Sequence, residues 1–186
     1  MILYHGTILE YAINILNNGI DVSYKAAKRG TDFGIGFYTT NFYKLAVTTA
    51  YSKKLLYKDN GINNTPVVIE MKYDISNNKY FISKNFNTPG HEWKEFVCIN
   101  RFPNIKQIDE ILKTNEFGKY DIICGPVADS AMSEVSTILR KNDYNLTDIV
   151  LDSIRPYKID RRIATQISFH NQMLADYIKV MGYKIV

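Results

Sequence analysis

Short apolar runs alternate with amphipathic segments along the first half of the chain. Residues 2–4 are apolar and predict a first strand, and residues 10–17 have the apolar spacing of a helix that ends before Gly19. Residues 36–40 are aromatic and β-branched, which predicts a second strand, and residues 42–57 return to helical spacing. Residues 67–73 begin apolar and then alternate, as a half-buried strand does.

The second half continues the mixture of periodicities. Helical spacing predicts helices over residues 89–101, 130–141 and 171–180. Apolar runs and the turn at Asn77-Asn78 predict strands over residues 80–82, 120–124, 163–169 and 183–186. Because helices are segregated from mostly antiparallel strands, the pattern predicts an α+β fold rather than a doubly wound sheet.

Length and hydropathy then limit the kind of protein. A chain of 186 residues with 46% hydrophobic content can bury one core, so we expect a single domain over residues 1–186. No window reaches the ~18 unbroken apolar residues of a membrane span. The first residues lack the basic and apolar regions of a signal peptide, so we expect a cytoplasmic protein without a membrane partner.

Cysteine usage and charge change this picture little. Cys98 and Cys124 have no CxxC spacing and sit in apolar surroundings, which predicts buried free thiols. The net charge of +4 could attract an anionic dinucleotide or, weakly, nucleic acid. The basic run at residues 155–162 also contains Asp160, and we interpret it as a solvated face rather than a phosphate track.

The sequence contains no recognised metal-binding motif and no phosphate-binding loop motif. The histidines His5, His91 and His170 lie at no recognised ligand spacing, and residues 91–95 are not HExxH. The Gly34-x-Gly36 pair lacks the third glycine of a dinucleotide fingerprint, and no GxxxxGK[ST] motif occurs. We therefore predict no metal.

Three short motifs carry the functional prediction. HGT stands at residues 5–7, FGIGFY at residues 33–38, and a further tyrosine at Tyr51. This order resembles the NAD-binding half of the diphtheria-toxin-like ADP-ribosyltransferases, a group that includes the poly(ADP-ribose) polymerases. The resemblance implies a split β-sandwich of two mostly antiparallel sheets with flanking helices, and NAD as substrate.

Motifs in the second half extend the resemblance over nearly the whole chain. They are WxxFV at residues 93–97, Asn100-Arg101, DIICGPVAD at residues 121–129 and QISFH at residues 166–170. Together they resemble a small bacterial family of the same clan, domain-of-unknown-function family 3990. The implied activity is mono-ADP-ribosyl transfer to an unknown protein or nucleic acid, or NAD hydrolysis.

The resemblance also implies roles for individual residues. The backbone amide and carbonyl of Gly6 would hold the nicotinamide carboxamide, where a side chain would block the ligand. His5 would bond the nicotinamide ribose or the adenosine side of NAD, and Tyr38 and Tyr51 would stack on the nicotinamide ring. Thr7 and Gly36 complete the predicted NAD-binding set.

The third catalytic position departs from the polymerases. Gln166 stands where a late strand carries their catalytic Glu, so the predicted catalytic set is His5, Tyr38 and Gln166. An amide cannot take a proton, which favours mono-transfer to a good nucleophile or NAD hydrolysis over chain elongation. Glu95, Asp129 or His170 could substitute as the base. A non-catalytic NAD or ADP-ribose binding module and a small basic nucleic-acid-binding domain are the alternatives.

Overall fold

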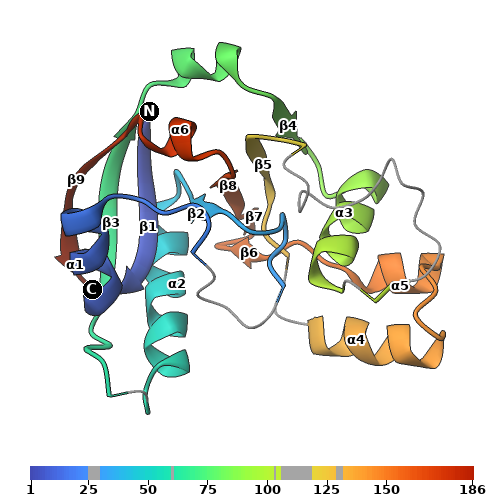
Figure 1. The fold of residues 1–186 in the computed structure, drawn as a ribbon. Coiled ribbons are helices and arrows are strands. Elements are labelled where there is room, and N and C mark those ends of the chain that lie inside the picture. Colours follow the sequence, from blue (N-terminus) through green and yellow to red (C-terminus); the bar gives the residue numbers. More distant parts are fainter. Residues whose placement is uncertain (25–29, 60, 103, 106–118, 129–131) are drawn as a thin grey trace.

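The strands form two sheets and a separate hairpin (Figure 1). The computed structural model describes residues 1–24, 30–59, 61–102, 104–105, 119–128 and 132–186. One sheet has three strands in the order β1-β3-β9, and the other has four in the order β2-β8-β5-β4. Within these residues every strand pairing is antiparallel except β4 with β5, so the predicted α+β class is confirmed.

The three-stranded sheet consists of β1 (Ile2–Ile8), β3 (Pro66–Tyr73) and β9 (Ile178–Ile185). Alternation turns Leu3, Ile69 and Met71 toward one core, where α1 (Leu9–Asn18) places Ala12. The other face of β1 and β3 carries α2 (Tyr43–Leu56), whose buried residues are Leu45, Ala46 and Ala50.

The four-stranded sheet consists of β2 (Phe37–Thr39), β8 (Thr165–Phe169), β5 (Ile122–Pro126) and β4 (Ser83–Asn85). Three helices lie on its far side from the first sheet (Figure 1): α3 (His91–Arg101), α4 (Met132–Lys141) and α5 (Asp148–Ser153). Their apolar faces enclose a second core that includes Phe33 and Trp93.

One backbone bridge joins the two sheets. Tyr4 of β1 and Thr40, directly after β2, exchange hydrogen bonds of 2.7 and 2.9 Å through their amides and carbonyls. Because this is an isolated bridge and not a ladder, β1 and β2 meet at one point and their pairing does not continue. The two sheets are thus connected edge to edge near the N-terminal motif.

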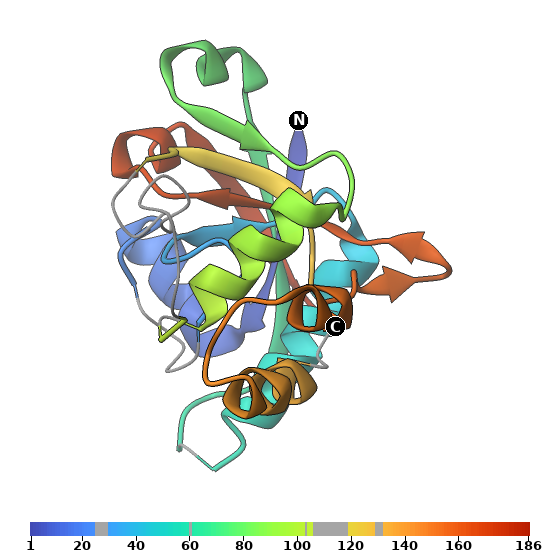
Figure 2. The same ribbon diagram turned by 90° about the vertical axis from the view of Figure 1, so that its right-hand side faces the viewer.

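A hairpin of β6 (Lys158–Ile159) and β7 (Arg162–Ile163) projects from the molecule (Figure 2). Its two turn residues, Asp160 and Arg161, have φ values of 50° and 66°, as a tight hairpin turn requires. The predicted strand at residues 163–169 is therefore divided between this hairpin and β8. Lys158, Arg161 and Arg162 are exposed, in agreement with a solvated basic face.

Two predicted elements are wrong. Residues 80–82 form no strand, since the 3-10 helix η1 (Ile75–Tyr80) ends at Tyr80 and the next strand, β4, begins only at Ser83. The helix starts after Asp74, whose carboxylate accepts from the Ser76 amide at 3.0 Å. The predicted helix over residues 171–180 is only one turn, α6 (Gln172–Ala175). From Ile178 onward the chain pairs with β3, so strand pairing overrides local helical spacing.

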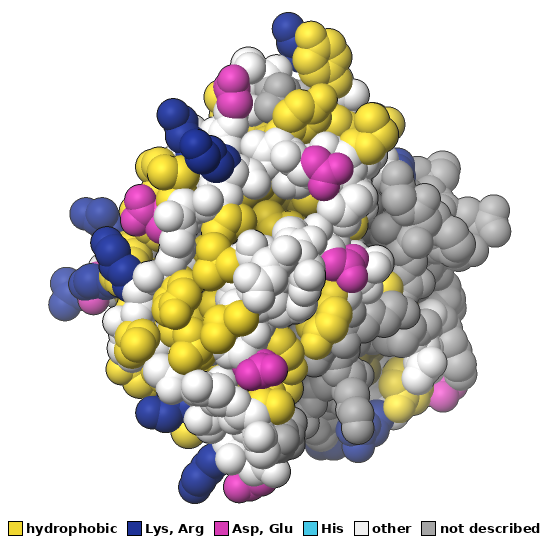
Figure 3. All heavy atoms as spheres, turned by 60° about the vertical axis from the view of Figure 1, so that its left-hand side comes forward, with side chains coloured by type: hydrophobic (Ala, Val, Ile, Leu, Met, Phe, Trp, Pro, Cys, Tyr) yellow, Lys and Arg dark blue, Asp and Glu magenta, His cyan; other side chains and the backbone are white. Residues whose placement is uncertain are grey.

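The thiols and the surface complete the description. Cys98 is buried, Cys124 is partly buried, and both are free, as predicted. Hydrophobic side chains are interspersed with charged ones on the face that Figure 3 shows, toward the β9 side of the molecule. Within the described part of the chain, no helix combines the length and hydrophobicity of a membrane span.

Candidate functional site

His5 of β1 contacts β2 directly beside the Tyr4–Thr40 bridge. Its Nδ1–H donates to the carbonyl oxygen of Tyr38 at 2.6 Å, and its ring stacks on Phe37 with 4.5 Å between centroids. Burial and nearby Lys53 lower the pKa of His5 to about 3, against the raising effect of the bond to Tyr38. His5 is therefore neutral at physiological pH and carries its proton on Nδ1.

Gly6 follows on the free edge of β1. Along this strand Tyr4 directs its amide and carbonyl away from β3, and alternation directs those of Gly6 the same way. Among the described residues neither group of Gly6 has a hydrogen-bond partner. An amide donor and a carbonyl acceptor thus lie side by side on the edge of β1 that is turned away from β3.

A side chain at Gly6 would point toward α2. A Cβ built there would overlap the carbonyl oxygen of Ala46 and lie 2.8 Å from the Ala50 amide nitrogen. The expectation that a side chain at Gly6 would meet a ligand is therefore wrong. Glycine is required at this position because the helix backbone packs directly on the strand.

Lys53 completes this group from α2. Its Nζ lies 3.3 Å from His5 Nε2 and 3.4 Å from the Thr7 hydroxyl, and both accept from the ammonium. The side chain is partly buried, and burial lowers the pKa of Lys53 to about 8. Both nitrogens of His5 are consequently occupied, one by Tyr38 and one by Lys53.

Tyr38 has an occupied hydroxyl and a partly buried ring. The hydroxyl donates to the Gly34 carbonyl at 2.6 Å and accepts from the Phe33 amide at 3.0 Å. Burial raises the pKa of Tyr38 well above its usual range. The tyrosine thus fixes the FGIG turn, and its backbone bond to His5 links that turn to β1.

Gly36, directly before β2, and His170, directly after β8, pack against each other at the edge where these two strands pair. A Cβ at Gly36 would lie 2.7 Å from His170 Nδ1 and from the Phe169 carbonyl oxygen. His170 Nδ1–H donates to the Ile35 carbonyl at 2.6 Å, and its Nε2 lies 2.8 Å from Ser168 Oγ. Burial lowers the pKa of His170 to about 4, so it is neutral.

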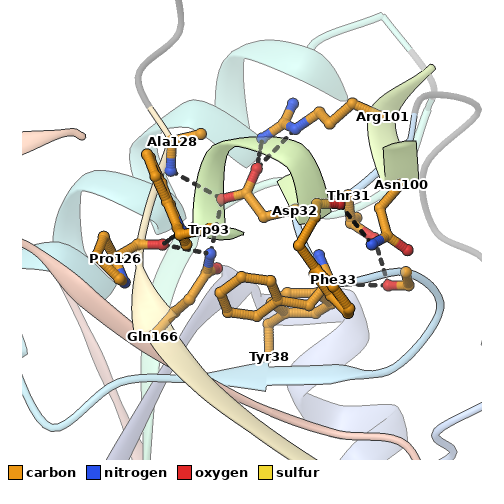
Figure 4. A network of polar contacts seen from close by, with 12 residues as sticks. Thr31, Asp32, Phe33, Tyr38, Trp93, Asn100, Arg101, Pro126, Ala128 and Gln166 are labelled. Atoms are coloured by element: carbon orange, nitrogen blue, oxygen red, sulfur yellow. Dashed lines mark hydrogen bonds and ion pairs between the residues drawn. The ribbon is translucent and has the colours of Figure 1, made fainter. Parts of the chain in front are cut away.

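Gln166 lies in a second polar cluster, around the buried carboxylate of Asp32 (Figure 4). Its Nε2 donates to Asp32 Oδ2 at 2.6 Å, and the Ala128 amide donates to the same oxygen at 2.9 Å. Arg101 donates to the other oxygen from both Nε and a terminal nitrogen, at 2.7 and 2.6 Å. The cluster ties the loop before β2 to α3, β5 and β8.

This cluster uses the amide nitrogen of Gln166 for structure. The side chain is 9% exposed, and its nitrogen also lies 3.4 Å from the Pro126 carbonyl, which accepts from Trp93 Nε1. The Oε1 oxygen has no hydrogen-bond partner among the described residues. A contact from Gln166 to a substrate hydroxyl would therefore use this oxygen as acceptor.

The remaining predicted residues lie apart from these two groups. Tyr51 is 45% exposed, and its ring contacts Lys54 on the outer side of α2. Glu95 lies on α3 with its carboxylate 3.4 Å from His91 Nδ1, and Asp129 falls outside the described residues. The structure thus brings together His5, Gly6, Thr7 and the backbone carbonyl of Tyr38, and the contact of the Tyr51 ring within the described residues is with Lys54.

Over the described ranges, no three His, Cys, Asp or Glu side chains come together as metal ligands would. Lys53 and Asp32 were missed in the sequence. Lys53 had a signal, because it continues the buried i, i+4, i+7 stripe of Ala46 and Ala50. Asp32 lies in an irregular loop, where periodicity carries no information.

Comparison with known proteins shows the family. The model of a family described as protein of unknown function (DUF3990) matches residues 1–180. The chain therefore belongs to DUF3990. No curated protein matches it.

Proposed function

We propose that this protein binds NAD along the free edge of β1, beside the Tyr4–Thr40 bridge to the second sheet, and transfers its ADP-ribose part to an acceptor or to water. The observation that carries the proposal is the free backbone edge at Gly6. Its adjacent donor and acceptor match the acceptor and donor of a carboxamide, the group by which nicotinamide can be held. Two sheets that meet at a single bridge beside this edge agree with the split sandwich implied by the motifs.

Tyr38 and His5 supply the surroundings of that edge. The rigidly held, partly buried Tyr38 ring is an aromatic surface that would suit an electron-poor pyridinium ring, and the Tyr38 carbonyl is bonded to His5 beside Gly6. Neutral His5 adds no second cation beside Lys53 that would repel the positively charged nicotinamide ring. Cleavage of the nicotinamide–ribose bond needs this kind of fixed geometry more than it needs acid–base chemistry.

A specific observation favours a second candidate, a non-catalytic NAD or ADP-ribose binding module. In the polymerase pattern a carboxylate stabilises the ribosyl cation, and here the carboxylate beside Gln166 is Asp32, already paired with Arg101. A paired, buried carboxylate offers little charge to a developing cation. Cleavage of NAD would then depend only on holding the nicotinamide leaving group in place.

The test is calorimetric NAD binding combined with nicotinamide release. We expect His5→Ala to weaken NAD binding by about 1–3 kcal/mol, because the tie between β1 and Tyr38 is lost. His91→Ala is the matched control, since His91 is exposed on α3. Release of nicotinamide by the wild type would support the enzymatic function. Binding of NAD without release would support the non-catalytic binding module.

Two results would contradict the proposal. One is the absence of NAD and nicotinamide binding by folded wild-type protein. The other is unchanged NAD affinity in a folded His5→Ala variant. Salt-sensitive nucleic-acid binding without NAD binding would instead favour a role for the basic hairpin at residues 158–163.

A further inference from the structure

Lys53 is a partly buried cation without a described counter-charge. Exposed Lys44 and partly buried Lys84 and Lys94 each pair with a carboxylate, on Asp160, Glu92 and Asp152 respectively. Lys53 instead contacts a neutral imidazole nitrogen and a hydroxyl oxygen. No carboxylate among the described residues forms an ion pair with it.

The position of Lys53 directs this charge toward the free edge of β1. Its stem leaves the face of α2 that packs on Gly6, and its ammonium reaches His5 and Thr7 on that strand. An ammonium has three N–H donors, and these two contacts use two of them. Among the described residues the ammonium has no third partner, so one donor and a positive charge remain for a ligand at the edge.

A partly desolvated cation with an unused donor favours an anionic ligand group. In NAD the phosphates are the negative groups, whereas the nicotinamide ring is positive and would be repelled. We propose that Lys53 binds a phosphate of the dinucleotide and so fixes which way NAD lies along the edge of β1. The inference rests on the proposed function, and it places a phosphate beside the His5 and Thr7 side chains that the ammonium contacts.

The test compares Lys53→Met with Lys54→Met. Methionine keeps a long apolar stem and removes the charge, and Lys54 is an adjacent exposed lysine on the same helix. Calorimetry would measure ADP-ribose, NAD, inorganic pyrophosphate and nicotinamide with each variant. We expect Lys53→Met to weaken ADP-ribose and NAD by about 10- to 100-fold and to reduce the salt dependence of binding, with nicotinamide unchanged.

The wild type provides an independent measurement if the variant does not fold. ADP-ribose affinity should fall as pH rises through the pKa of Lys53, about 8, because the neutral amine loses its attraction. His5, the titratable side chain that contacts Lys53 within the described part, is neutral throughout that range. A pH-independent affinity would overturn the proposal.

The outcomes separate this inference from the proposed function. If Lys53→Met binds ADP-ribose with wild-type affinity and salt dependence, the role of Lys53 is overturned although NAD binding stands. If the wild type binds pyrophosphate through Lys53 but neither NAD nor nicotinamide, the anion site stands and the proposed function fails. If the wild type binds neither ADP-ribose nor pyrophosphate, the anion site is overturned.

Discussion

At the scale of residues, Gln166 shows how the neighbours of a side chain determine its role. By the resemblance to the polymerases, Gln166 stands at the position of their catalytic glutamate. In the structure its amide donates to the buried carboxylate of Asp32. The amide is therefore the group that this position needs, because a carboxylate would face a second carboxylate.

We expect Gln166→Glu to destabilise the fold by roughly 3 kcal/mol at alkaline pH, since it buries an unpaired charge beside Asp32. The loss should be smaller in mild acid, where the two carboxyl groups can share a proton. Urea unfolding at two pH values measures both effects. Gln166→Met, which removes the amide without adding charge, is the control and should lack the pH dependence.

Equal stability of Gln166→Glu and wild type at alkaline pH would contradict the Asp32 contact. A stable Gln166→Glu variant with faster nicotinamide release would restore the catalytic reading of this position.

At the scale of elements, the packing of α2 on β1 places the proposed site. The helix approaches the strand closely because Gly6 has no side chain and because Ala46 and Ala50 are small. This contact positions Lys53 next to His5 and Thr7. One glycine thus serves both the fold, through its Cα, and the proposed site, through its backbone edge.

Gly6→Ala tests that contact. The added Cβ overlaps the Ala46 carbonyl, so α2 must move from β1, and we expect a loss of about 1–3 kcal/mol in unfolding free energy. At Gly90 a Cβ would have its nearest atom 3.5 Å away, at the Thr88 hydroxyl, so Gly90→Ala is the control, with a change within about 0.5 kcal/mol. Equal melting temperatures for Gly6→Ala and wild type would show that the helix is not held this tightly.

At the scale of the whole molecule, two neutral histidines connect segments that are distant in sequence. His5 ties β1 to β2, and His170, directly after β8, ties that strand to Ile35 before β2. Their pKa values are lowered from 6.5 to about 3 and about 4, chiefly by burial. Protonation of either ring would place a charge in a desolvated position.

Acid should therefore unfold this protein early. The unfolded chain takes up protons on both histidines near pH 6.5, whereas the folded chain does so near pH 3 and 4. The stability that the two neutral histidines contribute is full above pH 6.5 and falls as the pH falls toward 4, by at most about 1.4 kcal/mol per pH unit for each histidine. Urea midpoints across this range measure the slope, and His170→Gln should reduce it. An unchanged slope in the folded variant would contradict a neutral, buried His170.

The sequence by itself determined the elements whose local periodicity agrees with their burial. The helix at residues 10–17, with its end at Gly19, and the strand at residues 67–73 correspond to α1 and β3, because side-chain spacing already defines one buried face there. The HGT and FGIGFY motifs likewise marked His5, Gly6 and Tyr38, which the fold brings together.

Only the tertiary structure decided the features that depend on contacts between distant segments. The spacing at residues 178–180 predicts helix, but these residues form part of β9 because they pair with β3 through backbone hydrogen bonds. Asp32 meets Gln166 and Arg101 across more than sixty positions, and Lys53 meets His5 across β1, so no local pattern could pair them. The physical reason is that burial and charge compensation are properties of the folded neighbourhood, whereas periodicity records only the neighbours along the chain.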